Sequence, residues 1–431
     1  MTHHHHGPDE PMIAGWEGWR QRPVLRVIVA AVVSTAVATI VAVIALWPDG
    51  EGRAEAIATA DAFGVVTARV SATVTEEVVE PCSYSTEDDP QDCRFVRLVV
   101  HEGPEAGALV TIAPINVAFD TSIPPLEPGD DVILGYAEST NTYFFADLDR
   151  RGSLLWLALL FGAVVVALGR IRGVLALASM GITLFVLVAF VAPAVLDGSD
   201  PVLVCAVAAS AIAFSALFLT HGCSPVTTVA LAGTLGALGL TLALAWVFFS
   251  VASITGLGTE EGLVLPYLAG DIDLSGLLLG GAIIGALGAL DDITVTQTAT
   301  VAELRRRDPA ATVGDLFTSG IRVGREHIAA TVNTLLLAYV GASMPLLLLF
   351  SIADQSLVMV ANAEVVAVEI VRTLCGSIGL VAAVPVTTLL AAIVTAGDSS
   401  PTTPRIAMPT DDNATSRPRW DDFAPDEDRL D

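Results

Sequence analysis

The sequence predicts an α-helical polytopic membrane protein with about eight transmembrane helices and a small extracytoplasmic β domain inserted after the first helix. Two observations lead to this fold class. The 431 residues are 53% hydrophobic with a mean hydropathy of +0.66, which is more apolar than a soluble core requires. Eight apolar stretches could each span a bilayer, and the one long interruption between them alternates apolar and polar residues as strands do.

The first element in the chain is an N-terminal segment, residues 1–23, which we expect in the cytoplasm. Its tract of four histidines is either a shortened tag or a native start, and we exclude it from the fold. The first span, residues 24–46, is too long for the apolar core of a signal peptide, and the WPDG after it lacks the small residues of a cleavage site. We therefore expect a retained membrane anchor.

Residues 49–149 form the predicted extracytoplasmic domain. Alternating runs such as CRFVRLVVH and DDVILGY, separated by turn-forming pieces such as PPLEPGD, predict about five antiparallel strands. An OB-like barrel fits this pattern, and a sandwich is the alternative. Cys82 and Cys93 flank a polar loop on the predicted oxidising side, which favours a disulfide over two free thiols. The domain either caps the protein or docks a ligand or protein partner.

Residues 152–396 form a predicted seven-helix membrane domain, with spans at 154–168, 174–196, 202–220, 226–254, 274–290 or beyond, 328–352 and about 366–394. With eight spans, three arginine clusters lie on the same side of the membrane. Because cytoplasmic loops carry an excess of basic residues, that side is the cytoplasm, and both termini lie in it. Arg150 and Arg151 are the exception, and we expect them to reach lipid headgroups on the outer side. The acidic tail, residues 397–431, is predicted to be disordered and cytoplasmic.

A glycine stripe precedes two adjacent aspartates in the sixth span. Three glycines at helical spacing share one face that permits close contact with a neighbouring helix: Gly281, Gly285 and Gly288. At 100° per residue, Asp292 and Thr296 continue this stripe, whereas Asp291 points elsewhere. We therefore expect Asp292 to face the helix contact in the inner half of the membrane. The alternative is that the span ends at Leu290 and the aspartates form an interfacial cap.

Further polar residues lie in the last two spans. An amide such as Asn333 commonly hydrogen-bonds a neighbouring helix, and Glu369 and Arg372 can pair on one helix face, either inside the membrane or on an outer surface helix. Gly376 and Gly379 are predicted packing residues. The candidates for transport or ion binding are Asp291, Asp292, Thr296, Gln297, Asn333, Glu369 and Arg372.

Several functions are disfavoured by composition. The net charge of −26 argues against a nucleic-acid partner. Without lysine, the chain cannot contain a phosphate-binding G-x-x-x-x-G-K-[ST] loop. We find no metal-ligand cluster and no nucleophile with a base, so we expect no enzymatic activity, no metal and no cofactor. The lysine-free, alanine-rich usage suggests a bacterial source.

Three segments resemble the YibE/F-like family of multipass membrane proteins: GALGALDDITVTQTATVAEL, TVNTLLLAYVGASMPLLLLF and EIVRTLCGSIGLVAAVPVTTL. The resemblance covers about residues 20–396 and is strongest in the last third. Family members usually carry one aspartate after the glycine-rich run, whereas this chain has two, and helix phase assigns the role to Asp292. The resemblance implies an eight-span bacterial transporter or permease.

Two hypotheses follow. In the first, the protein is a secondary transporter in the bacterial plasma membrane for an unknown small molecule or ion. Asp292 is then the protonatable or ion-binding group, and Glu369 with Arg372 forms an outer gate or a substrate contact. In the second, it is a non-transporting scaffold or sensor whose outer β domain binds a partner or ligand and whose intramembrane polar groups only hold the helices together. Transport without a nucleotide site would be gradient-driven, facilitated or powered by a partner.

Overall fold

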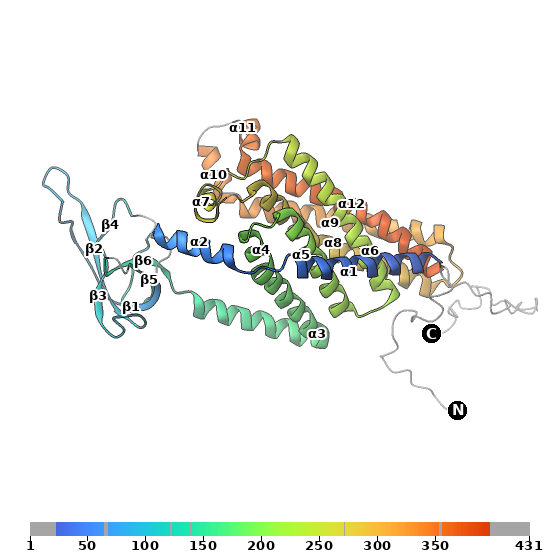
Figure 1. The fold of residues 1–431 in the computed structure, drawn as a ribbon, viewed down its shortest axis with the longest axis horizontal. Helices are drawn as coiled ribbons and strands as arrows, with labels where there is room; N and C mark the ends of the chain where they lie inside the picture. Colours follow the sequence, from blue (N-terminus) through green and yellow to red (C-terminus); the bar gives the residue numbers. More distant parts are fainter. Residues whose placement is uncertain are drawn as a thin grey trace, which may run out of the picture.

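The computed structural model is elongated, with a β domain at one end and a helical domain at the other (Figure 1). It describes residues 23–63, 68–120, 123–137, 140–270, 272–352 and 356–396. The histidine tract and the tail predicted to be disordered lie outside these residues. Helix α1 (Pro23–Ala45) runs along the helical domain, and α2 (Glu51–Ala62) leads from it to the β domain (Figure 1).

The β domain is one antiparallel sheet in the order β3-β2-β1-β5-β6, with β4 paired to β2. Its strands are β1 (Ala68–Pro81), β2 (Asp92–Val100), β3 (Leu109–Thr111), β4 (Ile115–Asn116), β5 (Asp131–Ala137) and β6 (Thr142–Leu148). Alternate residues such as Val70, Ala72 and Val74 are buried, as the period of two requires. Strands β3 and β6 end the path, so the described strands form an open sheet and the OB-like barrel is not confirmed.

The predicted disulfide is present. Cys82 and Cys93 are bonded, with their Cα atoms 4.9 Å apart, at the end of the β1–β2 hairpin. Asn116 of β4 lies beside this bond, and its Nδ2 donates to Tyr84 Oη at 2.9 Å and to Gln91 Oε1 at 2.8 Å. The loop between the cysteines is therefore held both covalently and by hydrogen bonds.

Replacing both Cys82 and Cys93 with serine should lower the free energy of unfolding of the β domain by about 3 kcal/mol or slightly less, because the bond closes a short loop in the unfolded chain. Pulse proteolysis of the whole protein across a urea series would measure the loss. Cys205→Ser, in a buried helix position, is the control for cysteine removal as such. Equal urea midpoints for the wild type and the double variant would contradict the prediction.

Helix α3 (Arg151–Val186) folds back on itself at Arg170, where φ is 52° and ψ is −131°. Across the turn, a Cβ at Gly173 would overlap Val165 O, and one at Gly162 would lie 3.8 Å from Leu177 Cδ1. A π-helical turn, η2 (Leu187–Val191), and α4 (Ala192–Leu196) continue the returning arm (Figure 1). The two arms occupy the segments predicted as the second and third spans.

The remaining helices are α5 (Pro201–His221), α6 (Pro225–Val251), α7 (Glu260–Ala269), α8 (Leu274–Arg307), α9 (Val313–Ala342), α10 (Met344–Ile352), α11 (Leu357–Asn362) and α12 (Glu364–Ala396). Among the described residues, six helical segments are long and apolar enough to cross a membrane, or seven if α9 and α10 form one span bent by 61°. This count takes both arms of α3 with α4 as one segment. The predicted seventh span is therefore bent rather than straight.

Helices α6, α8 and α12 form the centre of the helical domain. Their contact surfaces carry threonines that are at most 1% exposed: Thr234, Thr241, Thr294, Thr298, Thr387 and Thr388. The Oγ1 atoms of Thr234 and Thr294 are 2.6 Å apart and join α6 to α8. Between α6 and α12, Gly233 packs against Thr387 and Gly379 packs against Thr241. Each helix therefore has a glycine in contact with a threonine hydroxyl of the other helix.

Candidate functional site

The predicted glycine stripe lies on one face of α8, but that face is exposed. Gly281, Gly285 and Gly288 are all accessible from outside the bundle. The opposite face carries larger apolar side chains, including Ile283 and Leu290, and is fully buried. Burying those side chains removes more apolar area from solvent than burying glycines would. Within the described chain, the stripe is therefore not buried against a neighbouring helix as predicted, although Gly281 approaches the Arg372 side chain of α12.

The orientation of the two aspartates is opposite to the prediction. Asp292 continues the exposed stripe, as helix phase requires, and its side chain is exposed. Asp291 is half-buried, and its Oδ1 is inaccessible and has no hydrogen-bond partner in the described structure. The phase was correct, but the buried face of α8 was assigned wrongly. Asp291 is thus the inward-facing carboxyl group.

Asp291 lies level with the middle of α6. Thr294, one turn further along α8, contacts Thr234, which is nine residues from Pro225 and seventeen from Val251 at the ends of α6. Because α6 and α8 run in opposite directions, Asp291 lies one turn closer to the centre of α6. Helix α8 also continues for sixteen residues beyond it. The aspartates therefore do not cap a helix that ends at Leu290.

Three other candidates lie further along α8 or on α9. Thr296 is half-buried, and its hydroxyl donates to the Asp292 carbonyl oxygen at 2.8 Å. Gln297 is 1% exposed, and its Nε2 lies 3.4 Å from Gly320 O, where it joins α8 to α9. Asn333 is exposed on α9, and its amide makes no hydrogen bond to another helix in the described residues. Only Gln297 of the three connects two helices.

Glu369 and Arg372 form the predicted pair, with Arg372 Nη1 2.8 Å from Glu369 Oε1 and side chains 19% (Arg372) and 30% (Glu369) exposed. Arg372 Nη2 is 3.9 Å from the position of a Cβ at Gly281. Gly281 and Asp292 are eleven residues apart on α8, or about 16 Å. The ion pair and the aspartates are therefore separate polar groups at different levels.

Small cavities lie on both sides of Glu369. One of about 170 Å³ lies between α9, α10 and α12, and one of about 70 Å³ lies between α12, α8 and the loop before α7. Nearby, Glu364 accepts hydrogen bonds from the Thr255 hydroxyl and the Gly256 amide, which fixes that loop to the start of α12. Glu369 thus borders both cavities.

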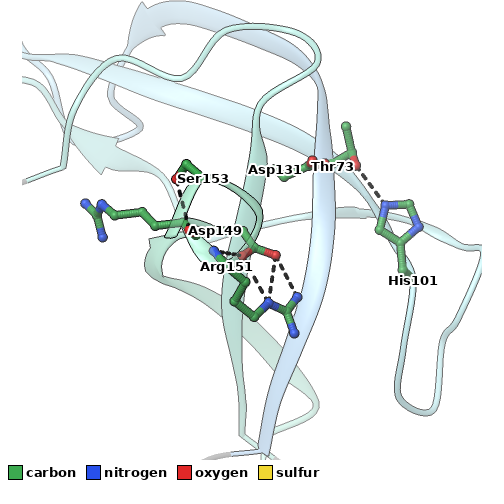
Figure 2. A network of polar contacts seen from close by, with 7 residues as sticks. Thr73, His101, Asp131, Asp149, Arg151 and Ser153 are labelled. Carbon is green, nitrogen blue, oxygen red and sulfur yellow. Dashed lines mark hydrogen bonds and ion pairs between the residues drawn. The ribbon is translucent and has the colours of Figure 1, made fainter. Parts of the chain in front are cut away.

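A polar network at the start of α3 was not predicted (Figure 2). Thr73 Oγ1 donates to Asp131 Oδ1 at 2.7 Å and lies 2.8 Å from His101 Nε2. Asp149 accepts from Arg151 Nε at 3.0 Å and Nη2 at 2.6 Å, and this partner lowers the pKa of Asp149. The network joins β1, β5 and the β domain's exit to α3. Thr73, His101 and Asp131 are far apart in the chain, so sequence spacing gave no signal for their contacts, whereas Asp149 and Arg151 are two residues apart.

Hydrogen bonds also hold in place the start of α2, the helix that leads into the β domain. Asp197, in the loop after α4, accepts hydrogen bonds from Gly50 N at 2.9 Å and Gly52 N at 2.9 Å at the start of α2. The hydrogen bond from Gly50, with further backbone donors, lowers the pKa of Asp197. The helix amino terminus adds a favourable dipole. One carboxylate therefore attaches the stalk of the β domain to the helical domain.

The Asp197 contact should depend on pH. The folded-state pKa of this carboxyl is lowered, so its contribution is present above the unfolded pKa of about 3.9 and is lost as pH falls through the folded value. We expect hydrogen exchange of α2, corrected for intrinsic rates, to increase below about pH 4 in the wild type and to be raised already at pH 7 in Asp197→Ala. Asp61→Asn, on the same helix, is the control. Unchanged α2 protection in Asp197→Ala would contradict the prediction.

Comparison with known proteins identifies the helical domain. Residues 157–397 match the family model described as YibE/F-like protein. This match contains α8, α9 and α12 and all the candidate transport residues, but neither α1 nor the β domain. Searches of curated proteins and of solved structures return no match. Since the matched segment is more than half of the chain, the protein belongs to the YibE/F-like family.

Proposed function

We propose that this protein is a bacterial membrane transporter or permease that does not itself hydrolyse ATP, and that Asp291 handles its coupling proton or cation. The observation that carries the proposal is the Asp291 carboxyl group, which lies level with the middle of α6 and has a buried oxygen without a hydrogen-bond partner among the described residues. A carboxylate in apolar surroundings is costly unless it takes up a proton or binds a cation. Membrane proteins keep such groups mainly for ion handling.

The proposed topology has eight spans, with both arms of α3 counted separately and α9 with α10 counted as one. Both termini are then cytoplasmic and residues 49–149 are extracytoplasmic. Two observations support this orientation. The disulfide suits an oxidising compartment. Arg150 and Arg151, which would break the positive-inside rule, each pair with a nearby aspartate, Asp147 or Asp149.

In this topology, the aspartates belong to the inner half of the membrane. Gln297 lies against Gly324 of α9, so the charged Arg325 lies at about the level of residue 296 of α8. If Arg325 marks the inner interface, Asp291 lies five residues, or about 8 Å, inside it. Glu369 and Arg372, on the opposite side, act as the outer gate of the same route. Their mutual pairing would have to loosen as the route opens.

Reconstitution tests this function. The full-length protein would be placed in liposomes containing a pH-sensitive dye, and metabolite mixtures would be added under an imposed proton gradient. The expected result is a proton flux that depends on a component of the mixture and is absent from protein-free liposomes. Absence of any solute-dependent proton flux, with protein shown to be folded and inserted in both orientations, would refute a proton-coupled mechanism.

A scaffold or sensor is the second candidate, with no catalytic activity in either case. The Asp197 contact favours it, because a force on the β domain would reach the α4–α5 loop through α2. A scaffold would show no solute-dependent flux and would retain a protein partner through the β domain. Crosslinking in cells followed by identification of the attached protein distinguishes the two.

A further inference from the structure

The helical domain holds a large cavity that plays no part in the proposed route. Its volume is about 830 Å³, and it lies between α5, α6 and α8 at the end nearer the β domain. The walls are mainly apolar and aromatic, and include Leu242, Trp246, Phe249 and Leu279. Trp246 is 63% exposed, so the cavity opens at the side of the bundle.

Two carboxylates line this cavity. Asp200 and Asp273 border both it and a second cavity of about 360 Å³ beside the α4–α5 loop. Each uses Oδ1 to cap its own helix, at 2.7 Å from Leu203 N and 2.9 Å from Gly276 N, respectively. In the described part of the chain, neither carboxylate forms an ion pair with a basic side chain. Two exposed carboxylates, each held at a helix amino terminus, therefore lie between the two spaces without a basic partner in the described chain.

The positions of these carboxylates are set by close packing of α5 on α8. A Cβ at Gly276 would lie 3.3 Å from Val202 Cγ2, and one at Gly280 would lie 3.3 Å from Pro201 O and overlap Cys205 Sγ. These glycines let the two helices start side by side. The capping hydrogen bonds then fix each carboxyl group at its helix start, so the arrangement exists before any ligand arrives.

We propose that the 830 Å³ cavity binds a lipophilic cation, with the charged group between Asp200 and Asp273 and the apolar part against Trp246 and Phe249. Opposite charge favours the cation, and the apolar walls favour a hydrophobic body. An anion of the same shape would be repelled. Asp291 is fifteen residues from Gly276 on α8, or about 22 Å away, so this site does not depend on the proposed transport mechanism.

Equilibrium dialysis of the purified full-length protein in a neutral detergent tests the proposal, with tetraphenylphosphonium as the probe and tetraphenylborate as its anionic counterpart. We expect saturable binding of the phosphonium that weakens at least tenfold in the double variant Asp200→Asn, Asp273→Asn. Asparagine keeps both helix caps, so the fold should survive. Asp315→Asn, which changes a capping carboxylate at the start of α9, is the matched control and should bind normally.

A second variant distinguishes loss of phosphonium binding from loss of folding. Trp246→Leu changes only an exposed wall residue, and we expect it to weaken phosphonium binding severalfold with no change in melting temperature. The proposal is overturned if the wild type shows no saturable binding, if the double variant binds as well as the wild type, or if the borate binds equally.

The same assay identifies the source of the cation. The occupant could be a lipid with an amine headgroup or a free lipophilic cation, since both carry the chemistry that the cavity recognises. Displacement of the phosphonium by phosphatidylethanolamine, but not by phosphatidylglycerol, would assign the site to a lipid headgroup. Retained binding in the presence of both lipids would assign it to a free cation.

Discussion

Replacing Gly379 with alanine is expected to destabilise the helical domain by about 1–3 kcal/mol, the usual range for overpacking a close contact. A Cβ at this position would overlap Thr241 Oγ1 and lie 3.2 Å from Thr241 Cβ. The threonine cannot turn away freely, because its hydroxyl donates to Ala237 O at 2.9 Å within α6. Helices α6 and α12 would have to separate along their shared surface. A lower melting temperature in detergent and a lower yield of monodisperse protein would show this.

Two matched variants make the test specific. Gly376→Ala lies on the same helix, but its Cβ would meet only Ala286 Cβ at an ordinary 3.7 Å, so it should be tolerated. Thr241→Ala combined with Gly379→Ala removes the obstructing hydroxyl and should recover most of the lost stability. If Gly376→Ala and Gly379→Ala proved equally harmful, the close approach of α6 and α12 would not be the cause.

The sequence was most informative where a pattern has a local physical cause. Apolar length located the helices, and the period of two located the strands. The cysteine pair was predictable because its loop is short and polar. The sequence could not show whether the sheet closes, because closure depends on pairing between β3 and β6, which are far apart in the chain. Helix α2 was missed within the β domain because part of its stabilisation comes from Asp197, about 145 residues away.

In the candidate site, too, local features could be predicted from the sequence, whereas features that depend on packing between helices could not. Helix phase correctly grouped Gly281 with Asp292, because that grouping follows from helix geometry alone. Which side of α8 is buried depends instead on which neighbours pack against it, and these are α5, α6, α9 and α12. Glycine spacing suggested a contact, but the larger side chains on the other face of α8 decided the packing. The sequence therefore assigned the functional role to Asp292, whereas the buried carboxyl oxygen in the described structure belongs to Asp291.

Paired substitution of the two aspartates tests this revised assignment. We expect Asp291→Asn to abolish solute-coupled flux in liposomes while the yield of folded protein stays normal, because asparagine keeps the shape but cannot exchange a proton. Asp292→Asn should retain most activity, since that side chain is exposed. Asp291→Glu, which keeps the carboxyl group, should restore part of the flux. Equal tolerance of Asp291→Asn and Asp292→Asn would remove Asp291 from the mechanism, and a loss of yield confined to Asp291→Asn would give that carboxyl a structural role instead.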